Sequence, residues 1–131
     1  MDKNLPLLFG SFYGFSSVLL GAFGAHELKT VLTTENLTVF ETAVRYQMYH
    51  ALILCVIGIL VFKTNNKFLT YSTYLFIFGV LIFSGSLYLY VATNIVLFAI
   101  ITPIGGVCMI LGWAVLFYFA WTYTNSDNPT P

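Results

Sequence analysis

Long apolar runs separated by short polar stretches dominate the order of residues along this chain. The first run is "LPLLFGSFYGFSSVLLGAFGA", residues 5 to 25, and the second starts at "AVRYQMYHALILCVIGIL" and covers residues 43 to 62. A helix needs about 20 apolar residues to cross the hydrocarbon of a bilayer. Each run is therefore long enough to form one transmembrane helix.

The segment between these two runs, residues 26 to 42, is the most polar internal part of the chain. Thr33 or Thr34 is suited to cap a helix, and Glu35 would lie in the first turn, where a carboxylate favours the positive end of the helix dipole. We therefore predict that a helix begins here and continues as the second span. The polar residues 63 to 67 predict a short loop after it.

The second half of the chain carries no charged residue between Lys67 and Asp127, so its internal turn is hidden. "TPIGG" (102 to 106) contains stronger helix breakers than "ATN" (92 to 94). A turn at Pro103 would leave a helix about 50 Å long before it, with too few apolar residues after it. The turn therefore belongs at "ATN", giving spans of residues 71 to 91 and 96 to 121, and Pro103 should kink the last helix.

These spans predict an all-α, polytopic membrane protein: a four-transmembrane-helix bundle with a kinked fourth helix. We expect one domain over residues 1 to 124 and a flexible tail over residues 125 to 131. A cleaved signal peptide is a competing interpretation of the first run, since Ala22 and Gly24 resemble a cleavage site. The run is longer than a typical signal core and only Lys3 leads it, which favours a retained span.

Charge is scarce and balanced, with five basic and five acidic residues and 8% charged residues in all. Soluble domains carry about 25%, so lipid is the expected solvent, and a nucleic-acid-binding surface is not expected. Lys3, Lys63 and Lys67 share one side of the membrane, and Lys29 and Arg45 the other. By a margin of about one charge, the positive-inside rule puts both termini in the cytoplasm.

Small residues recur at spacings of three and four along the first span: Gly10, Gly14, Ser17, Gly21 and Ala25. Lipid tails are as apolar as leucine, so membrane helices associate through close packing at such positions. The later spans add further candidates for close packing, namely Ala51, Cys55 and Gly58, then Gly105, Gly106 and Gly112. The stripes are typical of packing within one bundle, and a stripe on the first helix that binds a partner or a second copy is the alternative.

Polar side chains fall in the same, non-cytoplasmic half of the membrane when depth is counted from the turns. The candidate polar patch contains Tyr46, Gln47, His50, Ser84, Ser86 and Thr102. At about 100° per residue, Gln47 shares a face with Ala51, so it should point into the bundle. A rim nearer to water contains His26, Glu27, Glu41 and Arg45, and Arg45 is expected to reach the interface and pair with Glu41.

A histidine within a membrane helix is a functional candidate by default. His50 could relay protons, bind a polar ligand or ligate a metal or haem, or it could be satisfied by a Tyr or Gln neighbour and stabilise the bundle. A haem held between His26 and His50 is disfavoured because the two lie at different depths. Cys55 and Cys108 form neither a C-x-x-C motif nor a zinc spacing, so we expect no cofactor, no metal and no catalytic residues.

Four short motifs occur in order: "GAFGAH" (21 to 26), "YQMYH" (46 to 50), "FSGSLY" (83 to 88) and "TPIGG" (102 to 106), the last followed by "GW". In these motifs the chain resembles domain-of-unknown-function family 423, small bacterial inner-membrane proteins with relatives in eukaryotes. The resemblance implies four transmembrane helices in a plasma (inner) membrane and no assigned activity or active site. Glu27 and Phe40 depart from it, where a small or apolar residue and a tryptophan are common.

Three functions are compatible with this sequence. The first is a non-enzymatic helical-bundle module, either an accessory or scaffold subunit of a larger membrane complex or a homo-oligomer. The second is an oligomeric carrier or channel for protons or a small polar solute that uses the polar patch. The third is an enzyme acting on a lipid or quinone through His26, Glu27 and Glu41, which no recognisable catalytic motif supports. The first hypothesis is favoured.

Overall fold

Helices make up almost all of the described chain. The computed structural model describes the backbone of residues 1–126 and the side chains of residues 1–123. The elements, in order, are α1 (Leu5–Phe23), the π-helical η1 (Gly24–Leu28), α2 (Lys29–Val31), α3 (Thr34–Lys63), α4 (Lys67–Thr93) and α5 (Val96–Ser126). The first three are continuous, and the resulting four rods are each long and apolar enough to cross a membrane. The all-α fold with four transmembrane helices is therefore confirmed.

The helix ends are fixed by local polar groups. The hydroxyl of Thr33 accepts a hydrogen bond from the backbone N–H of Asn36 (3.2 Å) at the start of α3. The side chain of Asn66 accepts from the N–H of Phe68 (2.9 Å) at the start of α4. Asn94 ends α4 in the left-handed conformation, with φ 56°, which asparagine tolerates better than most residues. The predicted helix start near Thr33 and the turn at "ATN" are confirmed.

The first rod continues past its predicted end at residue 25, through η1 and α2 to Val31. His26 therefore lies within this rod and not at its end. The reason is local: Glu27, Leu28 and Lys29 are good helix formers, and a helix has no need to stop where the hydrocarbon ends.

The last rod, α5, runs unbroken through Pro103 to Ser126. Its kink at this proline stays a prediction. The helix reaches beyond the predicted domain end at residue 124, and residues 127–131 of the predicted tail lie outside the described residues.

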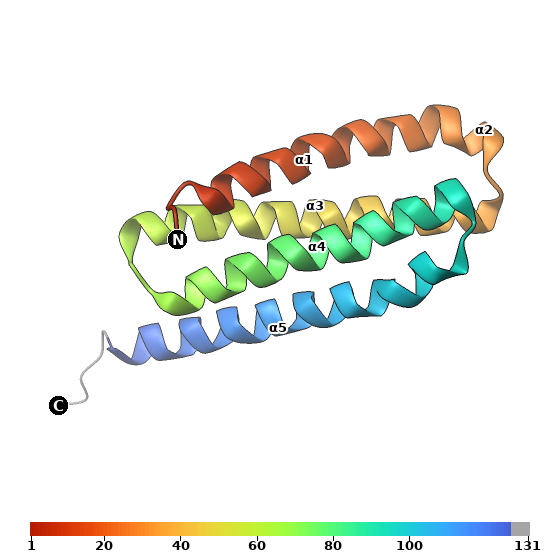
Figure 1. Ribbon diagram of the computed structural model, residues 1–131. Helices are drawn as coiled ribbons and strands as arrows, with labels where there is room; N and C mark the ends of the chain where they lie inside the picture. The colour runs from red at the N-terminus through yellow and green to blue at the C-terminus, as the bar shows by residue number, and fades with distance from the viewer. Residues whose placement is uncertain (127–131) are drawn as a thin grey trace.

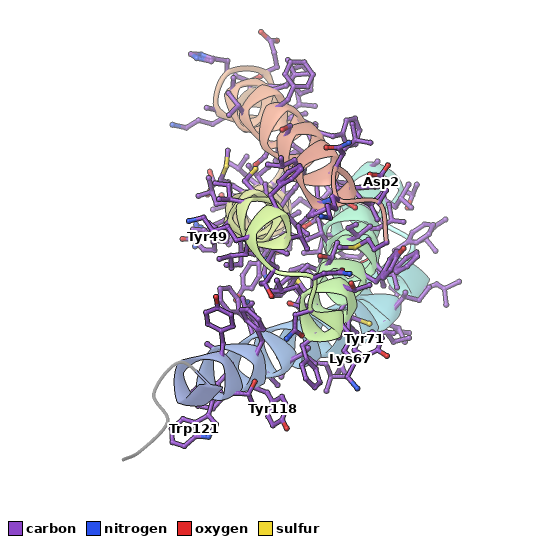
Figure 2. All side chains as sticks on the ribbon, turned by 90° about the vertical axis from the view of Figure 1, so that its left-hand side faces the viewer. Asp2, Tyr49, Lys67, Tyr71, Tyr118 and Trp121 are labelled. Carbon is purple, nitrogen blue, oxygen red and sulfur yellow. The ribbon has the colours of Figure 1, made fainter. Side chains whose placement is uncertain are left out.

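The rods are antiparallel, and α1, α3, α4 and α5 follow one another across the molecule in that order (Figure 1). The extensive interfaces are α1 with α3, α3 with α4, and α4 with α5. The end-on view shows α3 and α4 in the middle, flanked by α1 on one side and α5 on the other (Figure 2). The bundle is thus open, since its first and last rods each have one extensive interface.

The core lies between the two central rods. Leu54 and Ile57 of α3 and Leu69 and Phe76 of α4 are fully buried there. The outer faces of the flanking rods are apolar and exposed, as Phe15 on α1 (70%) and Phe117 on α5 (71%) illustrate. Apolar side chains that face outward are expected where the surrounding solvent is lipid.

Aromatic side chains mark the end of the molecule where α4 begins and α5 ends. Tyr71, Tyr118 and Trp121 are more than half exposed, and at this end Tyr71 lies near Lys67 of α4 while Tyr118 and Trp121 project from α5 (Figure 2). Tyrosine and tryptophan gather at the level of the lipid headgroups. These residues therefore indicate one boundary of the hydrocarbon layer.

Candidate functional site

Gln47 is the centre of the most connected polar cluster in the protein. Its side chain is buried (5% exposed), and its amide nitrogen donates to the carbonyl of Tyr13 (3.0 Å) and to the hydroxyl of Ser16 (2.7 Å) on α1. Its amide oxygen accepts from the hydroxyl of Tyr88 on α4 (2.9 Å). Because both N–H groups and the oxygen are engaged, Gln47 joins three rods.

Two further bonds strengthen this junction. The hydroxyl of Ser84 on α4 donates to the carbonyl of Ala43 on α3 (2.9 Å). The hydroxyl of Tyr13 on α1 donates to the carbonyl of Ile77 on α4 (2.9 Å). Each of these donors is a hydroxyl and each acceptor is main chain, so the bonds hold whole helices together.

His50 is buried (4% exposed) and lies less than one turn further along α3. Its Nδ1 is 2.7 Å from the carbonyl oxygen of Tyr46, and a carbonyl can only accept, so Nδ1 carries the hydrogen. The indole N–H of Trp113 on α5 donates to the other ring nitrogen, Nε2, at 3.2 Å. Both nitrogens are therefore used by a neutral imidazole in one defined tautomer.

Tyr46 is half out of the bundle, with 40% of its surface exposed. Its ring packs against Phe83 of α4 (centroids 4.9 Å apart) and stacks on the imidazole of His50 (6.3 Å). Together with Trp113 these rings line a cleft of about 260 Å³. His50 is thus embedded among aromatic rings, with its outer side facing this cleft.

Ser86 and Thr102 form the third cluster. Their hydroxyl oxygens are 2.7 Å apart, which joins α4 to α5. Each hydroxyl is also within hydrogen-bond distance of a carbonyl of its own helix, Phe83 for Ser86 and Phe98 for Thr102 (both 3.0 Å). One hydroxyl can therefore donate across the interface while the other donates locally.

The structure thus divides the predicted patch among separate helix interfaces. Gln47 and Ser84 line one groove with Tyr88, whereas Tyr46 and His50 line another. Every buried side-chain nitrogen and oxygen of the described residues has a hydrogen-bond partner. The patch residues are therefore split among two grooves and the contact between Ser86 and Thr102, where one shared pocket was expected.

Several partners in these clusters were not singled out from the sequence. Tyr13 and Ser16 were missed although Tyr13 follows Gly10 by three residues, on the face that carries the small-residue stripe. Tyr88 and Trp113 end two of the recognised motifs, "FSGSLY" and "GW", and received no role. Spacing on α1 and motif membership were thus the available signals.

The rim residues lie at the same end of the bundle as these clusters. His26 and Glu27 are exposed within the π-helical turn. Glu41 and Arg45 are exposed on α3 and line one cleft against Gly21 and the π-helical turn. No ion pair joins Glu41 to Arg45 in the part of the chain that the structure describes, so the predicted pairing is not formed. The reason is that both side chains are exposed, where holding two long chains together gains little.

The small-residue stripes face other helices of the same chain. A Cβ at Gly10 would lie 2.7 Å from Cys55 Sγ and 2.9 Å from the carbonyl oxygen of Ala51. A Cβ at Gly14 would lie 3.9 Å from Ala51, and one at Gly21 would lie 3.4 Å from Val44, both ordinary contacts with α3 side chains. On α5, a Cβ at Gly105 would meet the backbone of α4. One at Gly112 would meet the ring of Phe76, and one at Gly106 would meet the ring of Phe83. The glycines of α1 pack on α3, and those of α5 pack on α4.

The described residues contain no group of three or more His, Cys, Asp or Glu side chains that could hold a metal ion. Cys55 and Cys108 are free and partly buried.

Comparison with known proteins places the chain in a family. Residues 20–106 match the model of a protein family of unknown function, DUF423. A UPF0382 membrane protein of Staphylococcus epidermidis is 42% identical over 110 residues, covering 84% of this chain and 89% of the relative. UPF0382 membrane protein YwdK of Bacillus subtilis is 38% identical over 118 residues (89% and 96%), and the inner membrane protein YgdD of Escherichia coli is 32% identical over 116 (88% of each). No solved structure matches. The chain is a membrane protein and belongs to the DUF423 family.

Proposed function

We propose that this protein is a non-enzymatic helical module of the membrane, which acts as an accessory or scaffold subunit or as a homo-oligomer. One observation carries the proposal: the buried polar groups of the described residues are all satisfied within the chain. A buried polar group reserved for a substrate is expected to lack a partner until the substrate binds. Here the polar groups connect helices instead.

The hydroxyl bonds support the non-enzymatic part of this proposal. A serine nucleophile needs a neighbouring base to take its proton. Ser72 and Ser84 donate to main-chain carbonyls of other helices, Gly112 and Ala43, at 2.9 Å. These hydroxyls have structural partners and no base beside them.

The open arrangement of the four helices supports the proposal that the protein binds a partner or a second copy of itself. The flanking rods α1 and α5 leave broad apolar faces uncovered by the chain itself, and a partner helix or a second copy fits such a face as well as lipid does. The test is to extract the protein with its native lipids in polymer-bounded discs and to measure the mass of the particles. A defined oligomer or a stoichiometric partner is expected, and a strictly monomeric protein without partners would contradict the proposal.

A carrier of protons or of a small polar solute is the second candidate, favoured by the cleft beside His50. Transport would require His50 to release Trp113 and accept a proton at Nε2. Proton flux into vesicles with and without the protein distinguishes the two functions. Equal flux rejects the carrier, whereas flux that His50→Ala removes without lowering thermal stability would displace the structural proposal.

For the orientation, we propose that both termini face the cytoplasm, with the turns at Leu32 and at Asn94 on the opposite side. The distribution of lysines supports this orientation. A cysteine introduced at Asn65, in the loop between α3 and α4, should resist a membrane-impermeant thiol reagent in intact cells. A cysteine at Asn94 should react. Because Cys55 and Cys108 are native thiols, a variant with both replaced by alanine is the background.

A further inference from the structure

A cleft opens between the first rod and α3 at the end of the bundle that carries the rim. It measures about 250 Å³ and is walled by Gly21, Gly24, Phe40 and Val44, with Glu41 and Arg45 as its charged residues. In Figure 1, α1 and α3 lie close at the end where α1 begins and diverge toward this end. Two of the ten charged residues of the chain therefore line this one cleft.

The π-helical turn shapes one wall of the cleft. Gly24, its first residue, is buried, and a Cβ at this position would lie 2.7 Å from the ring of Phe40. The glycine thus lets Phe40 lie directly beneath the turn and form an apolar part of the lining. Single π-helical turns inside α-helices are frequent at functional sites.

The two charged side chains are left available to something outside the chain. Glu41 and Arg45 stand four residues apart on α3, within reach of each other, and they share no ion pair in the described structure. Both are exposed. A ligand that carries one negative and one positive group can therefore meet each of them separately.

Their order along the helix defines that ligand. α3 begins at Thr34, so Arg45 lies one turn deeper in the membrane than Glu41, about 6 Å along the axis. In a zwitterionic phospholipid the phosphate joins the glycerol next to the acyl chains, and the ammonium lies at the far end of the headgroup. The positive residue is thus at the depth of the phosphate, and the negative residue nearer to water, beside the ammonium.

We propose that this cleft binds the headgroup of an aminophospholipid, with the phosphate on Arg45 and the primary ammonium on Glu41. A guanidinium presents paired N–H donors that match phosphate oxygens. The apolar wall of Phe40 and Val44 can receive the first carbons of the acyl chains. The inference is independent of the proposed function, because it concerns the lipid at one face and not the presence of a partner.

The charge pattern predicts selectivity. A phosphatidylglycerol headgroup offers no cation to Glu41, and a phosphatidylcholine headgroup offers a cation without N–H donors. The test uses the full-length protein in detergent with equal amounts of phosphatidylethanolamine, phosphatidylcholine and phosphatidylglycerol, and counts bound lipids by native mass spectrometry. Phosphatidylethanolamine should be retained about fivefold over each of the others, the ratio that one partly exposed ion pair supports.

Matched variants separate the two contacts. Glu41→Gln should abolish the preference over phosphatidylcholine while lipid is still retained, and Arg45→Gln should lower the retention of all three lipids. Glu35→Gln and Lys29→Gln remove the same charges at the same end of the bundle but outside the cleft, so they should leave retention unchanged. Thermal melting reports whether each variant is folded. If Arg45→Gln does not fold, Arg45→Lys is tested in its place.

Three outcomes would overturn the proposal. The first is equal retention of phosphatidylethanolamine and phosphatidylcholine by the unmodified protein. The second is an effect of Glu35→Gln as large as that of Glu41→Gln. The third is displacement of the bound lipid by inorganic phosphate as effectively as by soluble glycerophosphoethanolamine, since the cleft would then be a simple anion site.

Discussion

The α4–α5 interface and the α1–α3 interface are built from the same kinds of contact but differ at one end of the bundle. In each, glycines bring two helices close, and a serine hydroxyl donates to a carbonyl of the facing helix at 2.9 Å: Ser72 to Gly112, and Ser17 to Val44. The α4–α5 interface stays closed toward the turn that joins them, where Ser86 and Thr102 meet. The α1–α3 interface opens into the charged cleft.

The difference lies in what the glycines touch near the end of the bundle that carries the rim. There Gly105 of α5 faces main-chain atoms of α4, at Phe83 and Gly79, whereas Gly24 of the first rod faces the ring of Phe40. Farther from this end the two interfaces both involve side chains, since Gly112 faces the ring of Phe76 and Gly10 faces Cys55 Sγ beside main-chain atoms of Ala51 and Cys55. Side chains can rotate and a helix backbone cannot. The comparison therefore predicts a fixed α4–α5 pair and an α1–α3 pair that can adjust at its open end.

The largest effect is expected from Gly105→Ala. The added Cβ would overlap the backbone nitrogen of Phe83 and lie 2.8 Å from the carbonyl oxygen of Gly79. Because neither can move without shifting α4, we expect a loss of about 3 kcal/mol in the free energy of unfolding. Unfolding by increasing denaturing detergent in mixed micelles measures it.

The neighbouring glycine provides the control for that substitution. Gly106→Ala places its Cβ 3.7 Å from the ring of Phe83, an ordinary contact. It should be neutral or slightly stabilising, since alanine favours helix over glycine. Equal losses for the two variants would show that the α4–α5 backbone contact does not control stability.

Gln47→Leu tests the polar part of the α1–α3 interface. It removes the hydrogen bonds to Tyr13, Ser16 and Tyr88, and bonds between membrane helices contribute about 0.6 kcal/mol each on average. We expect a loss of about 2 kcal/mol in the same unfolding experiment. In a Tyr88→Phe background the loss should be smaller, because that hydroxyl then no longer lacks an acceptor. Strict additivity would contradict the contact.

Gly10→Ala comes next, because its clash is only partly with main chain. Cys55 Sγ, 2.7 Å from the added Cβ, belongs to a side chain, but the carbonyl of Ala51 at 2.9 Å does not move freely. A loss of about 1.5 kcal/mol is expected, with partial recovery in a Cys55→Ala background. Gly14→Ala, whose nearest contact is at 3.9 Å, is the control. A loss at Gly10 as large as at Gly105 would remove the distinction between the two interfaces.

Two helix boundaries were predictable, each for its own reason. Thr33 caps the helix that follows it, which is a local cause, and the turn at Asn94 followed from the length that a bilayer imposes on a helix. The start of α4 at Lys67, inside the predicted loop, was missed because the cap at Asn66 was not recognised. The extension of the first rod to Val31 was missed, since hydropathy marks where a span leaves the lipid and not where its helix stops.

The polar clusters were only partly predictable. Counting residues from the turns gives the depth of a side chain, and periodicity gives the face of its own helix that it occupies. Neither tells which neighbouring helix that face meets. The bond from Trp113 on α5 to His50 on α3 therefore had no counterpart in the sequence analysis, although both residues lie in recognised motifs. Nor did the sequence show that Glu41 and Arg45 face a cleft.

The smallest effects are expected from removing the serine hydroxyls that donate across each interface. These two hydrogen bonds are the contacts in which the interfaces are most alike. Ser72→Ala and Ser17→Ala each remove one hydroxyl that is nearly or fully buried and its 2.9 Å bond to a carbonyl. These carbonyls lie inside helices and keep their main-chain partners, so no buried group is left unsatisfied. Each variant should lose about 0.6 kcal/mol in the free energy of unfolding. If α1 can adjust against α3 while α5 is fixed against α4, the loss at Ser17 should be the lower of the two, and the reverse order would argue that the α1–α3 pair is the more rigid one.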